Sequence, residues 1–257
     1  MSRAYTPGTV IKAIFGLQLL IGVVLVAGDV SGGLRAPGFA PNAPSLDQPV
    51  RPGDQTRRYQ TRDVPDVPNR PFPATPDMPS RLVLNDVEFE GSDALRLVGR
   101  VAPGDATRIA DQLAARIETQ DSIGPLLLHS PGGSVTDAVE LGRALRDLNI
   151  DTRIATGDVC LSACPYIFVG GVERAVDRDG SLGVHQHYFG ENTVLPAFLA
   201  IEDVQRGQGQ VMTYLDEMGV DPLLMQHALI TPPKSIYIFV RDELDRYRLI
   251  TDAGPES

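Results

Sequence analysis

The stretch LLLHSPGGSVTDAVELGRALRDL, residues 126–148, joins a short apolar run, a Gly-Gly turn and an amphipathic segment. Leu126–His129 predicts a buried strand, because it is a brief apolar run that ends at turn residues. Ser134 and Asp137 have the spacing of a capping box at a helix start. Apolar residues then recur at helical spacing as far as Leu148. A strand that passes through a tight turn into a helix is typical of an α/β domain.

The pattern continues on both sides of this stretch and predicts an α/β fold with parallel strands. Further strands are expected at residues 95–101, 152–156 and, after a turn, within 180–187. Further helices are expected at 105–117, 196–218 and 221–229.

The N-terminal sequence predicts that the rest of the chain is exported from the cytoplasm. Residues 10–27 read VIKAIFGLQLLIGVVLVA, which is close to the roughly 20 apolar residues that span a bilayer. Arg3 and Lys12 lie towards its N-terminal side, which favours a cytoplasmic N-terminus. A cleaved signal peptide, with a weak small-residue site at 26–28, is the alternative. Both interpretations place the remaining chain outside the cytoplasm, on the periplasmic side.

Four regions follow from this organisation. Residues 1–9 are expected to form a short cytoplasmic tail and 10–28 a transmembrane signal anchor or signal peptide. Residues 29–80 are rich in proline and predict a disordered linker. Residues 81–257 form the expected globular domain. The formal net charge of -10 argues against a nucleic-acid partner, because phosphates require a basic surface.

Three elements of the globular domain have the chemistry for acyl transfer. The Gly-Gly turn can present the bare amide of Gly133 to an oxyanion, and the amide of Ala163 could be the second donor. Ser162 precedes Pro165, which fits the first turn of a helix. Ser162 is therefore either a nucleophile at a strand-to-helix junction or simply a helix cap. His185 could act as its base.

The other candidate side chains leave alternatives open. His185 and His187 fall on the same face of the expected strand, so they could also be structural residues or metal ligands. Cys160 and Cys164 could complete a Cys/His zinc set, but their spacing matches no zinc-finger pattern. In an oxidising compartment the two cysteines could form a disulfide around Ser162, or they could remain buried thiols. We expect no metal and no cofactor.

The segments SPGGSVTDAVELGRALR, CLSACPYIFVGG, GSLGVHQ and DELDRYRLIT together resemble the ClpP/crotonase superfamily, and specifically ClpP-like serine proteases. The resemblance covers roughly residues 93–252. It implies a fold of repeated ββα units, with Ser162 as nucleophile and His185 as base. It also implies an oxyanion hole formed by the amides of Gly133 and Ala163, and a homo-oligomer.

The third catalytic residue departs from the family pattern. The resemblance places Thr251 at the position of the family aspartate, with Asp252 as the nearest carboxylate. A one-residue bulge could bring Asp252 to His185. Otherwise the site is a Ser-His pair in which Thr251 or a backbone carbonyl orients the ring. Exported relatives of the signal-peptide peptidase and NfeD types use a lysine base, whereas this chain offers His185.

The predicted function is that of a membrane-anchored, extracytoplasmic serine endopeptidase that acts on a peptide or protein substrate. One alternative is a crotonase-type enzyme acting on a thioester, which needs no serine nucleophile. The other is a non-catalytic scaffold protein that retains the fold. Labelling of the serine separates these classes.

Overall fold

The computed structural model describes residues 7–30, 56–58, 71–72, 78–119, 123–187 and 197–251. The chain divides into two compact units, Met1–Pro44 and Ser45–Ser257. The first unit contains helix α1, Pro7–Val30, so the segment expected to enter the membrane is helical. Among the described residues, however, no helix combines the length and the apolar character needed to cross a bilayer. The predicted spanning helix at 10–28 therefore finds no support there.

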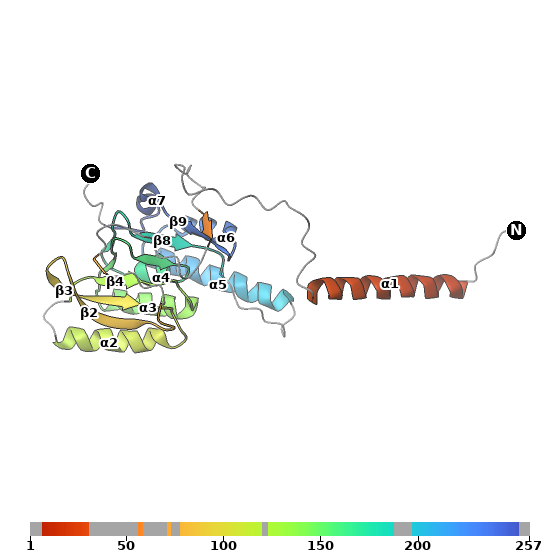
Figure 1. Ribbon diagram of the computed structural model, residues 1–257, viewed down its shortest axis with the longest axis horizontal. Helices are drawn as coiled ribbons and strands as arrows, with labels where there is room; N and C mark the ends of the chain where they lie inside the picture. The colour runs from red at the N-terminus through yellow and green to blue at the C-terminus, as the bar shows by residue number, and fades with distance from the viewer. Residues whose placement is uncertain are drawn as a thin grey trace. The chain divides into compact units, whose positions relative to one another are not determined.

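The second unit contains a five-stranded sheet, which confirms the α/β class (Figure 1). The four strands from β3 onwards run parallel, as expected from the strand-helix alternation, and β2 adds an antiparallel edge that the sequence analysis missed. In spatial order the strands are β2 (Val83–Phe89), β3 (Ser92–Val98), β4 (Leu126–His129), β5 (Thr152–Ile154) and β7 (Arg174–Val176).

A second sheet has four strands in the order β1-β9-β8-β6. Its strands are β1 (Thr56–Arg58), β9 (Ser235–Ile238), β8 (Ser181–Val184) and β6 (Val159–Leu161). Strand β8 ends at Val184, so the expectation that His185 and His187 share a strand face is wrong: both follow the strand. Strand β1 lies within residues 29–80, so the expected linker contributes an edge strand.

The helices of the second unit follow strands of both sheets: the first two connect strands of the five-stranded sheet, and the later ones follow strands of the second sheet (Figure 1). They are α2 (Asp105–Thr119), α3 (Val135–Asp147), α4 (Cys164–Phe168), α5 (Ala197–Glu217), the 3-10 turn η1 (Pro222–Leu224), α6 (Met225–Ile230) and α7 (Arg241–Arg246). The core joins apolar residues of α2 and α3, such as Ile109 and Leu141, to Leu97 and Leu128 of the sheet. Their helical and alternating spacing places these side chains inside.

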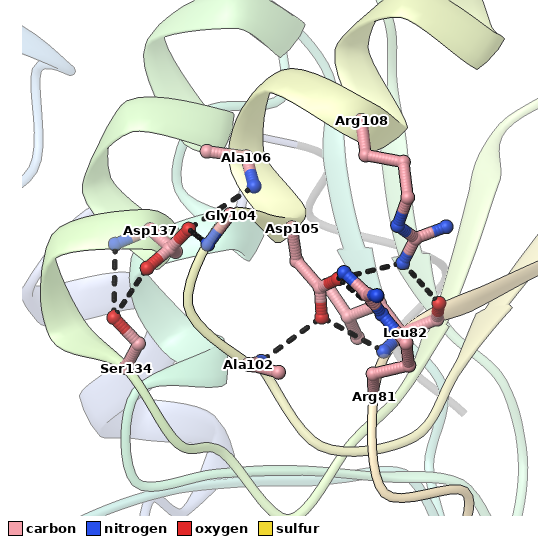
Figure 2. A network of polar contacts seen from close by, with 9 residues as sticks. All are labelled: Arg81, Leu82, Ala102, Gly104, Asp105, Ala106, Arg108, Ser134 and Asp137. Carbon is pink, nitrogen blue, oxygen red and sulfur yellow. Dashed lines mark hydrogen bonds and ion pairs between the residues drawn. The ribbon is translucent and has the colours of Figure 1, made fainter.

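A carboxylate ties the starts of α2 and α3 together beside the Gly-Gly turn (Figure 2). Ser134 caps α3, and its hydroxyl donates to Asp137 Oδ2 over 2.6 Å. Asp137 Oδ1 accepts from the amides of Gly104, at 2.7 Å, and Ala106, at 3.3 Å, in the first turn of α2. One buried carboxylate therefore satisfies donors that a helix start leaves unpaired and holds the residue after Gly133 in place.

A second carboxylate, Asp105, is fully buried at the start of α2 (Figure 2). Burial would raise the pKa of this carboxyl, because it penalises the charged form. The hydrogen bonds it accepts from the Leu82 amide, Arg108, the Ala102 amide and Arg81 outweigh burial and lower its pKa to about 2. Asp105 therefore stays ionised throughout the ordinary pH range.

We expect Asp105→Asn to lower the free energy of unfolding by about 3 kcal/mol, because it leaves buried donors and two guanidinium groups without an anion. The pKa falls on folding from 3.8 to about 2, so the contribution is complete above about pH 4 and is lost as the pH falls through about 2. Urea unfolding at neutral pH and at pH 3 measures both effects. Asp86→Asn, at a side chain 60 % exposed, is the control, with an expected loss below about 1 kcal/mol. Equal losses in the two variants would contradict the prediction.

Candidate active site

Ser162 lies at a sharp junction between strand β6 and helix α4. Its φ of 62° places a non-glycine residue in the left-handed region, which costs on the order of 1 kcal/mol or more and is concentrated at functional sites. The N-cap of α4 is Ala163, and Pro165 lies in the first turn as expected. Ser162 is therefore not the helix cap, and the interpretation of Ser162 as a capping residue is wrong.

The surrounding backbone fixes this junction on three sides. The Ser162 amide donates to the Gly183 carbonyl of β8 over 2.9 Å, and the Leu161 amide donates to the Ser130 carbonyl over 3.0 Å. A disulfide joins Cys160 to Cys164 across the junction, with their Cα atoms 5.1 Å apart. The sequence left disulfide and free thiols open, and the structure has the disulfide. These links hold the strained conformation of Ser162.

His185 lies directly beside the serine, at the end of β8. Its Nε2 atom is 2.7 Å from Ser162 Oγ, and its Nδ1 atom is 3.1 Å from the carbonyl oxygen of Pro233. A carbonyl oxygen can only accept a hydrogen bond, so Nδ1 carries the proton and donates it. In neutral His185, Nε2 is then left with its lone pair towards the serine hydroxyl. This is the tautomer that a general base requires.

The environment of His185 favours the neutral form. The residue is 7 % exposed, and burial lowers its pKa below the ordinary value, while the hydrogen bond to Pro233 opposes the shift. A neutral imidazole accepts a proton from serine, and an imidazolium cannot. His185 can therefore accept a proton at neutral pH and somewhat into the acidic range.

We expect the rate of Ser162 modification by a fluorophosphonate to rise with pH and to reach its half-maximum below pH 6.5, the ordinary pKa of histidine. The direction follows because a lowered pKa keeps His185 deprotonated at more acidic pH. Labelling rates between pH 4.5 and 8, with circular dichroism to verify folding at each point, measure the midpoint. A midpoint above 6.5 is the result that contradicts this expectation.

The Gly-Gly turn lies against the serine junction. A Cβ atom on Gly132 would lie 2.6 Å from Ser162 Cβ and 2.7 Å from the Ala163 nitrogen, so only glycine permits this approach. The Gly132 amide donates to Ser130 Oγ over 3.1 Å, whereas Gly133 is exposed. Among the described residues, no hydrogen bond occupies the amide of Gly133 or of Ala163. These two amides are therefore available as oxyanion donors.

Thr251, one of the candidates for the third residue of the site, lies elsewhere. Thr251 Oγ1 accepts a hydrogen bond from the Arg174 amide and donates one to the Glu173 carboxylate. The Thr251 side chain is therefore bonded to the start of strand β7. The expectation that Thr251 orients the base is thus wrong, and Asp252 lies outside the described residues. The Pro233 carbonyl oxygen bonds His185 Nδ1, as expected for the alternative in which a backbone carbonyl orients the ring. The sequence pointed to no particular carbonyl, because only the chain path between α6 and β9 brings residue 233 to His185.

The remaining candidates have structural partners. His187 Nε2 is 2.8 Å from the Tyr166 hydroxyl, and burial together with neighbouring His185 lowers the pKa of His187 to about 4. Cys160 and Cys164 are bonded to each other, so neither is a thiolate ligand. Within the described part of the chain, no group of three or more potential metal ligands is present.

Fold and site together define an α/β protein with a hydrogen-bonded Ser-His pair beside two uncommitted backbone amides. No protein-family model matches the chain, and no curated protein matches it either.

Proposed function

We propose that the chain is a serine endopeptidase with a ClpP/crotonase-like fold, of the ClpP-like branch. The observation that carries the proposal is the 2.7 Å contact between Ser162 Oγ and His185 Nε2, with Nδ1 bonded to the Pro233 carbonyl. The left-handed backbone of Ser162 and the motifs shared with ClpP-like proteases support the same assignment. A scaffold protein has no need of a strained serine paired with an oriented imidazole.

The residues support a two-step acyl transfer. Ser162 Oγ attacks the peptide carbonyl carbon while His185 Nε2 takes the hydroxyl proton. The negative charge that develops on the carbonyl oxygen is stabilised by the amides of Gly133 and Ala163. As the C–N bond breaks, His185 gives its proton to the leaving amine. A water molecule, activated by the same base, then hydrolyses the acyl-serine ester and regenerates both groups.

The Pro233 carbonyl is one of the partners of His185, and it accepts the hydrogen bond of Nδ1, the ring atom that bonds a carboxylate in a Ser-His-Asp triad. Its partial negative charge fixes the tautomer of His185, but it stabilises the imidazolium less than a full charge does.

The proposal places the enzyme outside the cytoplasm. The Cys160–Cys164 disulfide supports this location, because disulfides persist in exported proteins and are rare in the cytosol. Self-association also belongs to the proposal. It is supported by large apolar side chains that are exposed in the described part of the second unit, among them Met212, Leu223, Leu229 and Ile230.

Covalent labelling tests the proposal. A fluorophosphonate carrying a biotin group should modify the wild-type protein, and mass spectrometry should locate the adduct on Ser162. The Ser162→Ala variant should fold normally and give no adduct. The reagent phosphorylates an activated serine and does not need the natural substrate, so it suits an enzyme whose substrate is unidentified.

The alternatives give different results. A crotonase-type enzyme would hydrolyse an acyl-thioester equally well in the wild type and in Ser162→Ala, and neither would be labelled. A scaffold protein would give no labelling and no hydrolysis of a dye-labelled casein. Either outcome would overturn the peptidase assignment.

A further inference from the structure

A short segment of the N-terminal region forms the outer strand of the sheet that carries the catalytic pair. Strand β1, Thr56–Arg58, pairs antiparallel with β9, with Thr56 opposite Tyr237 and Arg58 opposite Ser235 (Figure 1). The sequence around β1 is rich in proline and predicted a plain spacer. Strand β1 nevertheless pairs with β9 through backbone groups, so this pairing does not depend on the identity of its side chains.

The register places this edge beside the catalytic base. Tyr237 of β9 pairs with Thr56 on one side and with Val184 of β8 on the other, and Val184 immediately precedes His185. Strand β9 starts two residues after Pro233, whose carbonyl binds His185 Nδ1. Only strand β9 therefore lies between this outer edge and β8, the strand that leads into His185. Neighbouring strands lie roughly 5 Å apart.

An edge of this kind recognises extended polypeptide of any sequence. The unpaired N–H and C=O groups of an edge strand bind a peptide by adding it as a further strand, and the main chain supplies the hydrogen bonds. A three-residue strand forms few such bonds, so a longer extended segment can replace it. Peptide segments of a protease substrate have the required conformation.

We propose that the outer edge of β9 is a docking site for extended substrate segments, and that Thr56–Arg58 occupies it in cis until a substrate displaces it. The proposal rests on the peptidase function for the identity of the ligand. It assigns β1 a role beyond covering an exposed edge: the segment competes with substrate next to the catalytic base. Displacement leaves Ser162, His185 and Pro233 in place.

Hydrogen exchange of the β9 amides tests the docking edge without relying on activity. Replacing residues 56–58 together by proline removes every N–H that β1 can donate. The matched control replaces the same three residues by alanine, which keeps the amides. Successive β9 amides alternate between β8 and β1, and the Phe239 amide donates to Leu182 of β8, so the amides of Ile236 and Ile238 face β1. We expect these two amides to lose protection in the proline variant and to keep it in the alanine variant. A synthetic peptide of sequence GDQTRRYQT, residues 53–61, should restore protection when added to the proline variant.

Kinetics then test competition with substrate. Hydrolysis of dye-labelled casein should show a severalfold higher kcat/KM in the proline variant, and the added peptide should reverse the gain. Labelling by the small fluorophosphonate should be the same in the wild type and both variants, because it does not need the edge. If none of the three proteins is labelled, the proposed peptidase function is wrong. The hydrogen-exchange result would still test whether β1 holds the β9 edge, because it does not depend on activity.

Three outcomes overturn the inference. Unchanged exchange of β9 in the proline variant shows that β1 does not hold the edge. Deprotected β9 with unchanged casein hydrolysis shows that β1 only covers the edge. Protection that returns with rising concentration of the proline variant alone shows that a second copy of the chain, and not substrate, is the partner.

Discussion

His185→Gln is expected to lower the rate of casein hydrolysis on the order of 10⁴-fold, because it removes the general base while keeping a polar side chain of similar length. Ser162 would then have to lose its proton to water, which is a poor base. The fluorophosphonate labelling rate should fall in parallel, since it depends on the same activation of Ser162. Initial rates with dye-labelled casein, together with labelling time courses, measure the loss.

His187→Gln is the matched control. This residue lies two positions further along the same segment, but its Nε2 contacts the Tyr166 hydroxyl and not the serine. We expect it to retain most of the activity. A His185→Gln variant that hydrolyses casein at the wild-type rate would exclude His185 as the base. An equal loss in both variants would show that the segment as a whole, rather than the His185 imidazole, is what the substitutions disturb.

Gly133→Ala is expected to cost both stability and activity. Gly133 has a φ of 150°, and an added Cβ would overlap the Val101 carbonyl oxygen and lie 2.9 Å from its carbon. Since the Val101 backbone lies in the adjacent segment and cannot simply rotate away, strain and overlap together should lower the free energy of unfolding by roughly 2–6 kcal/mol. The displaced amide should also reduce kcat about 10²–10³-fold, as expected for the loss of one oxyanion donor.

Urea unfolding and casein kinetics at a temperature where the variant remains folded separate these two effects. Gly219→Ala is the control for backbone strain alone, because Gly219 has a φ of 74° and open space where a Cβ would lie. We expect it to lose a smaller amount of stability and no activity. If Gly133→Ala folds and keeps the wild-type kcat, the Gly133 amide does not stabilise the oxyanion.

Local patterns predicted most of the elements that carry the site. The apolar run at Leu126–His129 and the Ser134 cap are confirmed, and the core positions of α2 and α3 follow from their spacing. The hairpin strand β2 was missed. Its side chains are mostly exposed or half-buried, so it lacks the apolar run by which a buried strand is recognised.

The candidate site was predictable only in part. Ser162 and His185 were identified by residue type, order and resemblance, and the structure brings them together. The left-handed conformation of Ser162 was not foreseeable, because nothing in its side chain requires that conformation. The position of Thr251 was misjudged, because proximity to a sequence motif does not determine which face of the unit a residue reaches.

By itself the sequence determined the α/β alternation, the glycine turn and the identity of the two candidate catalytic side chains. These features depend on residue type and on spacing within one or two elements, which local physical chemistry controls. Only the tertiary structure decided that a Pro233 carbonyl orients His185, that Cys160 pairs with Cys164, and that residues 56–58 pair with β9. Each of these contacts depends on how the segments pack in three dimensions, and the local sequence encodes no such distance.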